Sequence, residues 1–183
     1  MTGSLHESVL LLFVPEAEPV VRAWRDRYDP SSREGVPAHV TLLYPFLPAE
    51  SIGTPDLARL RSFFGGKPPL SLTFSEFGRF PGVLFLKPDD DPRLRDLLGS
   101  LLASYPELPP YGGQFPDPQP HHTVAQAIEE SVMVEIEADV SRALPFASSV
   151  SDAALMVDAG GRWVVRERFT FGESGAQKVL APR

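Results

Sequence analysis

The segments HVTLLYPF at residues 39–46 and PHHTVA at residues 120–125 repeat one short phrase in two distant parts of the chain. Each phrase has a histidine followed two positions later by a threonine. Side chains at positions i and i+2 of a strand lie on the same face, about 6.5–7 Å apart. Each segment therefore predicts a strand that presents an imidazole beside a hydroxyl. The predicted pairs are His39 with Thr41 and His121 with Thr123, and the alternating positions that we expect to face the packing beneath are Val40, Leu42, His122 and Val124.

The rest of the chain alternates strand-like and helix-like patterns, separated by its 20 prolines and 14 glycines. Apolar runs and alternating residues predict strands, whereas apolar residues spaced three and four apart predict helices. The predicted strands cover about residues 9–14, 39–46, 70–74, 83–86, 121–126, 147–157 and 162–171, and the predicted helices about residues 20–28, 54–64, 91–102 and 129–144.

This order of elements, βαβαββαβαββ, divides into two similar runs of strand, helix, strand, helix and strand, with one strand added. The boundary between the two runs lies near residues 80–90. Hairpins and short connections favour antiparallel sheets with helices packed against them. We therefore expect one bilobal α+β domain over residues 1–183. In this duplicated fold, two mainly antiparallel sheets carry helices on their outer faces and enclose a central cleft.

Composition restricts the class of partner, because the chain has a formal net charge of −7. Proteins that follow long nucleic acids usually show a basic surface, so long duplex DNA or RNA is not an expected partner, whereas a small nucleotide or a short RNA end is. The absence of cysteine excludes thiol nucleophiles and cysteine-based zinc sites. The apolar run at residues 9–14 is too short to cross a membrane and has no basic residue before it. We expect a cytoplasmic protein that acts as a monomer.

A twofold arrangement of the two halves would bring the two His-x-Thr phrases together across the central groove. Imidazoles titrate near pH ~6.5, so one can act as a base and the other as an acid at the same phosphorus. The hydroxyls can donate hydrogen bonds to phosphate oxygens. This scheme suits in-line displacement at phosphorus and requires no metal or cofactor. His6 lies at a chain end without a symmetric counterpart, and we expect it to be structural or solvent-exposed.

The two phrases, with RFPGVLFL at residues 79–86 and PYGG at residues 110–113, resemble the two-histidine (2H) phosphoesterase superfamily, in particular its 2′-5′ RNA ligase-like and cyclic phosphodiesterase branch. The resemblance implies a bilobal fold with a cleft, and activity on 2′,3′-cyclic phosphates or 2′-5′ phosphodiester linkages. By match to the motif, it implies that His39 and His121 are catalytic and that Thr41 and Thr123 bind phosphate. His122 departs from the family pattern, which has an apolar residue there, and we interpret it as a hydrogen-bonded neighbour.

Further side chains near these segments are candidates to contact a substrate. The aromatic residues that could stack on a base are Tyr44, Phe46, Phe80 and Tyr111, and packing in the core is the alternative for each. Arg166 and Arg168 could hold a phosphate, although an exposed charged face also explains them. The proline-rich segment 105–120 is either a connector or a wall of the groove. At the level of function, ligation or cleavage of 2′-5′ linkages and a non-catalytic nucleotide-binding module are the alternatives to a phosphoesterase.

Overall fold

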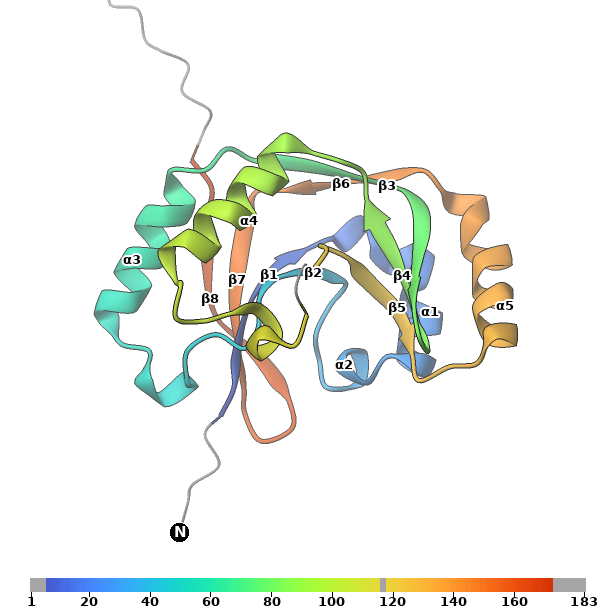
Figure 1. Ribbon diagram of the computed structural model, residues 1–183, viewed down its shortest axis with the longest axis horizontal. Helices are drawn as coiled ribbons and strands as arrows, with labels where there is room; N and C mark the ends of the chain where they lie inside the picture. Colours follow the sequence, from blue (N-terminus) through green and yellow to red (C-terminus); the bar gives the residue numbers. More distant parts are fainter. Residues whose placement is uncertain (1–5, 116–117, 173–183) are drawn as a thin grey trace, which may run out of the picture.

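The computed structural model describes residues 6–115 and 118–172 and shows two four-stranded antiparallel sheets (Figure 1). The first sheet has the strand order β2-β1-β7-β8, and the second has the order β5-β4-β3-β6. The predicted α+β class with two antiparallel sheets is confirmed. The strands are β1 (Ser8–Phe13), β2 (His39–Leu43), β3 (Leu70–Phe80), β4 (Val83–Pro88), β5 (His122–Gln126), β6 (Phe146–Val150), β7 (Asp152–Asp158) and β8 (Trp163–Thr170).

Helices cover the outer faces of both sheets, as predicted. They are α1 (Glu18–Tyr28), α2 (Pro30–Arg33), α3 (Thr54–Gly65), α4 (Pro92–Ser104) and α5 (Glu130–Val140). α3 packs on β8 and α4 contacts β2, whereas α1 packs on β5 and contacts α5. Figure 1 accordingly shows α3 and α4 on one side of the molecule and α1 and α5 on the other. No helix within residues 6–115 and 118–172 is long and apolar enough to cross a membrane.

Each sheet takes strands from both halves of the chain. β3 belongs to the first half but pairs with β4 and β6 of the second sheet, and β7 belongs to the second half but pairs with β1 of the first sheet. α1 and α4 also cross over, because each packs against the sheet that lacks the strand preceding it. A boundary near residues 80–90 therefore falls at the β3–β4 hairpin and not between the two sheets.

Three strands differ clearly from their predicted extents. The strand predicted over residues 39–46 ends at Leu43, three residues early. The single strand predicted over residues 147–157 is wrong, because β6 ends at Val150, β7 begins at Asp152, and the two belong to different sheets. No proline or glycine interrupts the chain here, and only the polar residues Ser151 and Asp152 stand at the break. β3 runs six residues beyond the predicted Phe74, because its polar end pairs with β4 as far as Phe80.

One hydrophobic core is shared by the two sheets. Leu10 and Leu155 from the first sheet and Leu72 and Leu84 from the second belong to the same buried cluster. The side chains predicted to alternate with the His-x-Thr pairs are buried as expected, namely Val40, Leu42, His122 and Val124. Burial of these intervening side chains thus fixes the orientation of each strand, so that its His and Thr point away from the core.

We predict that Gly78→Ala lowers the free energy of unfolding by about 1–3 kcal/mol, because it overpacks a filled space. Gly78 in β3 lies opposite Phe85 in β4, and a Cβ at Gly78 would lie 2.1 Å from Phe85 Cε2. Urea unfolding monitored by circular dichroism measures the change. Gly99→Ala in α4 is the control, because a Cβ there meets nothing within 4 Å. It should raise the free energy of unfolding by about 0.4–1 kcal/mol. Equal effects at the two positions would contradict the packing argument.

Candidate active site

The two predicted catalytic histidines make the same hydrogen bond in the two halves. His39 Nδ1 lies 2.7 Å from Pro37 O, and His121 Nδ1 lies 2.7 Å from Gln119 O. A carbonyl oxygen only accepts, so each Nδ1 carries a proton and donates it. The other nitrogen, Nε2, is therefore the atom of each ring that can take up a proton from a reacting group or deliver one to it.

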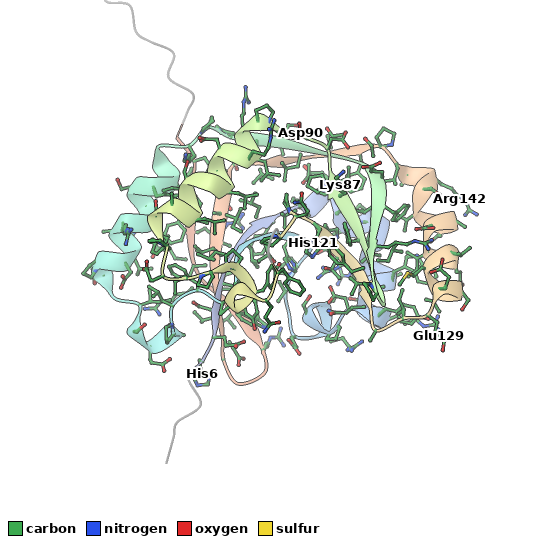
Figure 2. The ribbon with its side chains drawn as sticks, viewed as in Figure 1. His6, Lys87, Asp90, His121, Glu129 and Arg142 are labelled. Atoms are coloured by element: carbon green, nitrogen blue, oxygen red, sulfur yellow. The ribbon has the colours of Figure 1, made fainter. Side chains whose placement is uncertain are left out.

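These two rings share one cavity of about 780 Å³. Thr41 and Thr123 line the same cavity, so the structure brings together the four residues of the two phrases. β2 and β5 are edge strands of different sheets, and they contact each other where the two sheets meet. The predicted convergence of the phrases at a central cleft is confirmed. In Figure 2, His121 lies in the middle of the molecule and His6 at its periphery.

Burial keeps both imidazoles largely neutral near pH 7. Burial is the main cause that lowers the pKa of His39 to about 4, and the positive charge of Arg25 lowers it further. Burial also lowers the pKa of His121, while its hydrogen bond to Gln119 O opposes this effect. In both rings, desolvation outweighs the hydrogen bond that favours the charged form.

His122 joins the two phrases across the seam between the sheets. Its side chain is fully buried, and Nδ1 donates to His39 O at 2.9 Å. The ring also makes edge contacts with His39 and Phe74, at centroid distances of 6.4 Å each. His122 Nε2 has no hydrogen-bond partner among the described residues, and burial lowers the pKa of the ring well below its usual value. This histidine is therefore a neutral hydrogen-bond donor that holds the backbone of His39.

A buried ion pair lies beside the cavity, and the sequence analysis did not predict it. Arg25 Nη2 lies 2.9 Å from Asp29 Oδ2, and both side chains are buried. Asp29 Oδ1 accepts from Gln126 Nε2 at 3.0 Å, which ties the end of α1 to β5. Asp29 and Gln126 line the cavity. Arg25 lies four residues after Val21, on the apolar stripe of a helix, and that placement was the available signal for a buried charge.

Three of the four predicted aromatic residues line the cavity: Tyr44, Phe80 and Tyr111. Phe115 and Trp163 join them and were not predicted as contacts. Phe46 is wrong as a candidate, because its side chain is buried in the core against the ring of Tyr105, at 5.2 Å between centroids. Its even position shares the inward alternation of Val40 and Leu42, which are buried as well.

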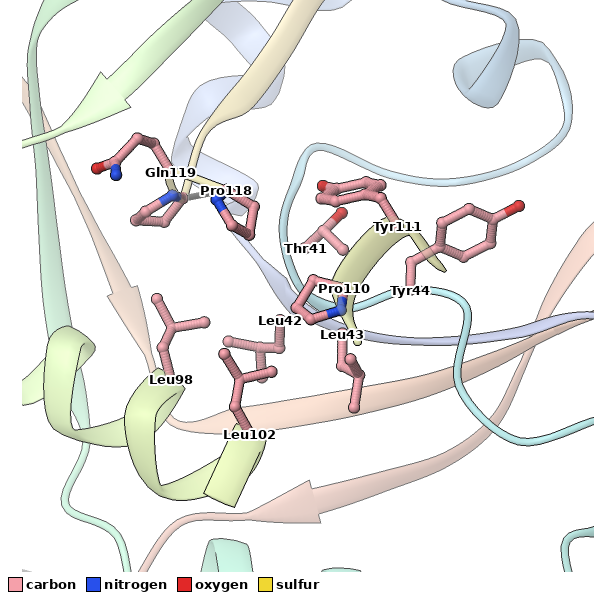
Figure 3. A pocket seen from close by; sticks show the side chains of 11 residues that line it. Thr41, Leu42, Leu43, Tyr44, Leu98, Leu102, Pro110, Tyr111, Pro118 and Gln119 are labelled. Atoms are coloured by element: carbon pink, nitrogen blue, oxygen red, sulfur yellow. The ribbon is translucent and has the colours of Figure 1, made fainter. Parts of the chain in front are cut away.

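Tyr111 is held over Thr41 by an unusual backbone. Its φ is +52°, in the left-handed region that aromatic residues seldom adopt, and its N–H donates to Tyr44 O at 2.6 Å. Figure 3 shows the Tyr111 ring above the hydroxyl of Thr41, beside a smaller cavity of about 50 Å³. The proline-rich segment therefore supplies a wall of the cleft, through Tyr111, Phe115 and Pro118. Residues 116–117 of that segment lie outside the described residues.

The two arginines of β8 do not face the cavity. Arg166 donates to Ala49 O and Ile52 O at 2.6 Å each, and Arg168 forms an ion pair with Asp152 at 2.8 Å. The alternative interpretation of these two arginines is therefore the correct one: they lie on a charged face and bind other groups of the protein. Among the residues described, no group of three or more His, Asp or Glu side chains is placed to hold a metal ion.

We predict that His122→Asn retains most of the wild-type turnover, because the Asn side-chain amide places a donor where His122 Nδ1 lies. His122→Gln places its donor one bond further out, and His122→Leu has none. Both should lower kcat by roughly 10- to 100-fold if His39 shifts by a fraction of an ångström. Steady-state kinetics on a nucleoside 2′,3′-cyclic phosphate, a substrate that the family resemblance implies, and urea unfolding of all three variants measure this. Equal losses in the Asn, Gln and Leu variants, in step with lost stability, would show that only packing matters at this position.

Comparison with known proteins places this arrangement in a family. None of the curated proteins compared with the chain matches it. The structure is similar to Escherichia coli LigT complexed with 3′-AMP, with a TM-score of 0.60 and 20% sequence identity over 93% of this chain and 100% of that one. It is also similar to TT0787 of Thermus thermophilus, with a TM-score of 0.57 and 19% identity over 92% of this chain and 100% of that one. The 2′-5′ RNA ligase superfamily matches residues 13–162. The chain therefore belongs to the 2′-5′ RNA ligase superfamily of 2H phosphoesterases.

Proposed function

We propose that this protein is a metal-independent phosphoesterase that opens 2′,3′-cyclic nucleotide phosphates or acts on short RNA ends that carry them. The observation that carries the proposal is that the rings of His39 and His121 share one cavity, each with Nδ1 bound to a carbonyl and Nε2 available. His39, His121, Thr41 and Thr123 are the proposed catalytic and phosphate-binding residues. The complex of LigT with 3′-AMP supports a nucleoside phosphate as the kind of ligand.

The proposed step is an in-line displacement at phosphorus. One neutral imidazole takes a proton from water through Nε2 while the water oxygen forms a bond to phosphorus. The bond from phosphorus to the 2′ or 3′ oxygen breaks, and the other imidazole, in its charged form, gives its Nε2 proton to that leaving oxygen. Thr41 and Thr123 donate hydroxyl hydrogen bonds to the non-bridging oxygens, whose charge grows in the transition state. Counted over the two Nε2 atoms, the pair of histidines thus carries one proton before the step and one proton after it.

A second candidate is cleavage or ligation of 2′-5′ linkages. It is favoured by the size of the cavity, about 780 Å³, and by aromatic side chains near both phrases, Phe80 beside His121 and Tyr44 three residues after Thr41. Such a cavity lies in the upper part of the usual range for small-ligand sites, roughly 300–1,000 Å³. A linkage with one base on each side of the phosphorus would use both groups of aromatic residues. The same acid and base would serve that reaction.

We predict that His39→Ala and His121→Ala each lower kcat for 2′,3′-cyclic nucleotides by roughly 10²- to 10⁴-fold, because each removes one proton-transfer group. The wild type should keep its activity in EDTA. His6→Ala is the matched control, because His6 is exposed and does not line the cavity, and it should change kcat by less than about twofold.

Product analysis by chromatography distinguishes the candidates. Turnover limited to 2′-5′-linked oligonucleotides would support the second candidate. Nucleotide binding without turnover of either substrate would identify a non-catalytic binding module. Loss of activity in EDTA would rule out the metal-independent scheme.

We predict a bell-shaped dependence of kcat/KM on pH with its maximum below about pH 6.5, the ordinary histidine pKa. The active free enzyme carries one proton on the histidine pair, and burial lowers the pKa of His121 and lowers that of His39 to about 4. The rate should therefore fall as pH rises past the higher pKa of the pair, which belongs to both rings together. Circular dichroism at each pH separates this effect from acid unfolding. A rate that still rises from pH 7 to pH 8.5 would contradict it.

A further inference from the structure

The charged residues that line the cavity are both acidic. Among the lining residues that the structure describes, Asp29 and Glu34 are the only Asp, Glu, Lys or Arg side chains. The two catalytic imidazoles are largely neutral near pH 7, because burial lowers the pKa of each. A phosphate in this cavity therefore meets hydroxyls and imidazoles but no Lys or Arg among the described lining residues, the kind of side chain that usually pairs with a second phosphate group.

The two carboxylates differ in their partners. Asp29 is paired with the buried guanidinium of Arg25, so its charge is largely offset. Glu34 is exposed, and no described Lys or Arg forms an ion pair with it. Its backbone is fixed, because Trp163 N–H donates to Glu34 O at 2.8 Å. The side chain of Arg162 lies beside Gly35 but does not line the cavity. Glu34 thus contributes to one end of the cleft a negative charge that no ion pair with a described Lys or Arg offsets.

That end of the cleft is aromatic as well as acidic. The Tyr44 ring makes edge contacts with the rings of Tyr111 and Trp163, each at 6.3 Å between centroids. The Tyr44 hydroxyl donates to Glu7 Oε2 at 2.6 Å. Burial, followed by the carboxylates of Glu7, Glu34 and Asp158, raises the pKa of Tyr44 to about 12. These surroundings suit a neutral or cationic ring and disfavour an anion.

We infer that the cleft selects phosphodiesters with a single negative charge, namely nucleoside 2′,3′-cyclic phosphates with a free 5′-hydroxyl, and discriminates through Glu34 against the same compounds carrying a further phosphate. This inference rests on the proposed phosphoesterase function and narrows its substrate to mononucleotides, because an RNA end carries further phosphate charges. Glu34 acts at a distance on the charge of the ligand and takes no part in proton transfer.

The same charges assist release of the product. Hydrolysis of a cyclic phosphate, which carries one negative charge, gives a phosphate monoester that carries nearly two above its second pKa of about 6. The product therefore experiences more repulsion from Glu34 than the substrate does. Product inhibition should accordingly be weak at neutral pH.

The experiment compares adenosine 2′,3′-cyclic phosphate with its 5′-phosphorylated form. At low salt the wild type should favour the 5′-hydroxyl compound in kcat/KM by roughly 3- to 50-fold, which is what Coulomb's law gives for two unit charges at a chosen separation of about 7 Å, between water-like and surface dielectric constants. High salt should reduce the preference. Glu34→Gln should narrow it and Glu34→Lys should abolish or reverse it. Glu135→Lys, which makes the same change on the exposed face of α5, should leave the preference unchanged.

Equal kcat/KM for the two compounds in the wild type, or the same preference in wild type and Glu34→Lys, would overturn the inference. Binding to the His121→Ala variant, measured by calorimetry with both compounds, separates this result from the function itself. If the wild type turns over neither compound but binding still follows ligand charge and Glu34, the proposed function fails and the charge selection stands. If both compounds are hydrolysed but bind and react alike, the function stands and the charge selection fails.

Discussion

The site depends on the contact between two edge strands that belong to different sheets. β2 and β5 each end a four-stranded sheet, and each would otherwise present an open edge. Exposed edges favour pairing with other chains, and proteins generally cover or interrupt them. Here the two edges face each other at the seam, and His122 donates to His39 O across it. The seam therefore both protects the edges and brings the two His-x-Thr faces to one cavity.

This arrangement is enforced by the exchange of elements between the two halves. β3 and β7 each pair within the sheet of the other half, and α1 and α4 each pack on the opposite sheet. The two lobes consequently share one buried cluster and cannot separate without exposing it. The strict geometry that the proposed paired proton transfer requires is thus supplied by the common core.

The sequence predicted the local features of the site better than its long-range ones. The alternation of buried and polar positions predicted correctly that Val40 and Val124 face the core while their neighbours face the cleft. An alternation of buried and polar residues is a local signal, so it can be recognised without knowledge of the partner strands. The break at Ser151 and the position of Trp163 of β8 in the cleft depend on which strands pair and pack together. A local sequence pattern does not contain that information. Phe46 illustrates the opposite error, since proximity in sequence to the motif suggested a role that its burial excludes. Cellular location and monomeric state stay predictions.

The duplicated scaffold makes the two histidines alike, and the residues around them make them different. Both Nδ1 atoms donate to the carbonyl two residues earlier, so the hydrogen bonds give neither ring an advantage as acid or base. Burial disfavours the charged form of both rings, and at His39 the guanidinium of Arg25 is a further cause. Arg25 belongs to α1, which is part of neither motif. The difference between the two histidines therefore arises from packing around the motifs. A symmetric pair of motifs thus has unequal electrostatic surroundings, and the proposed mechanism needs such a difference for one ring to hold the single proton while the other accepts one.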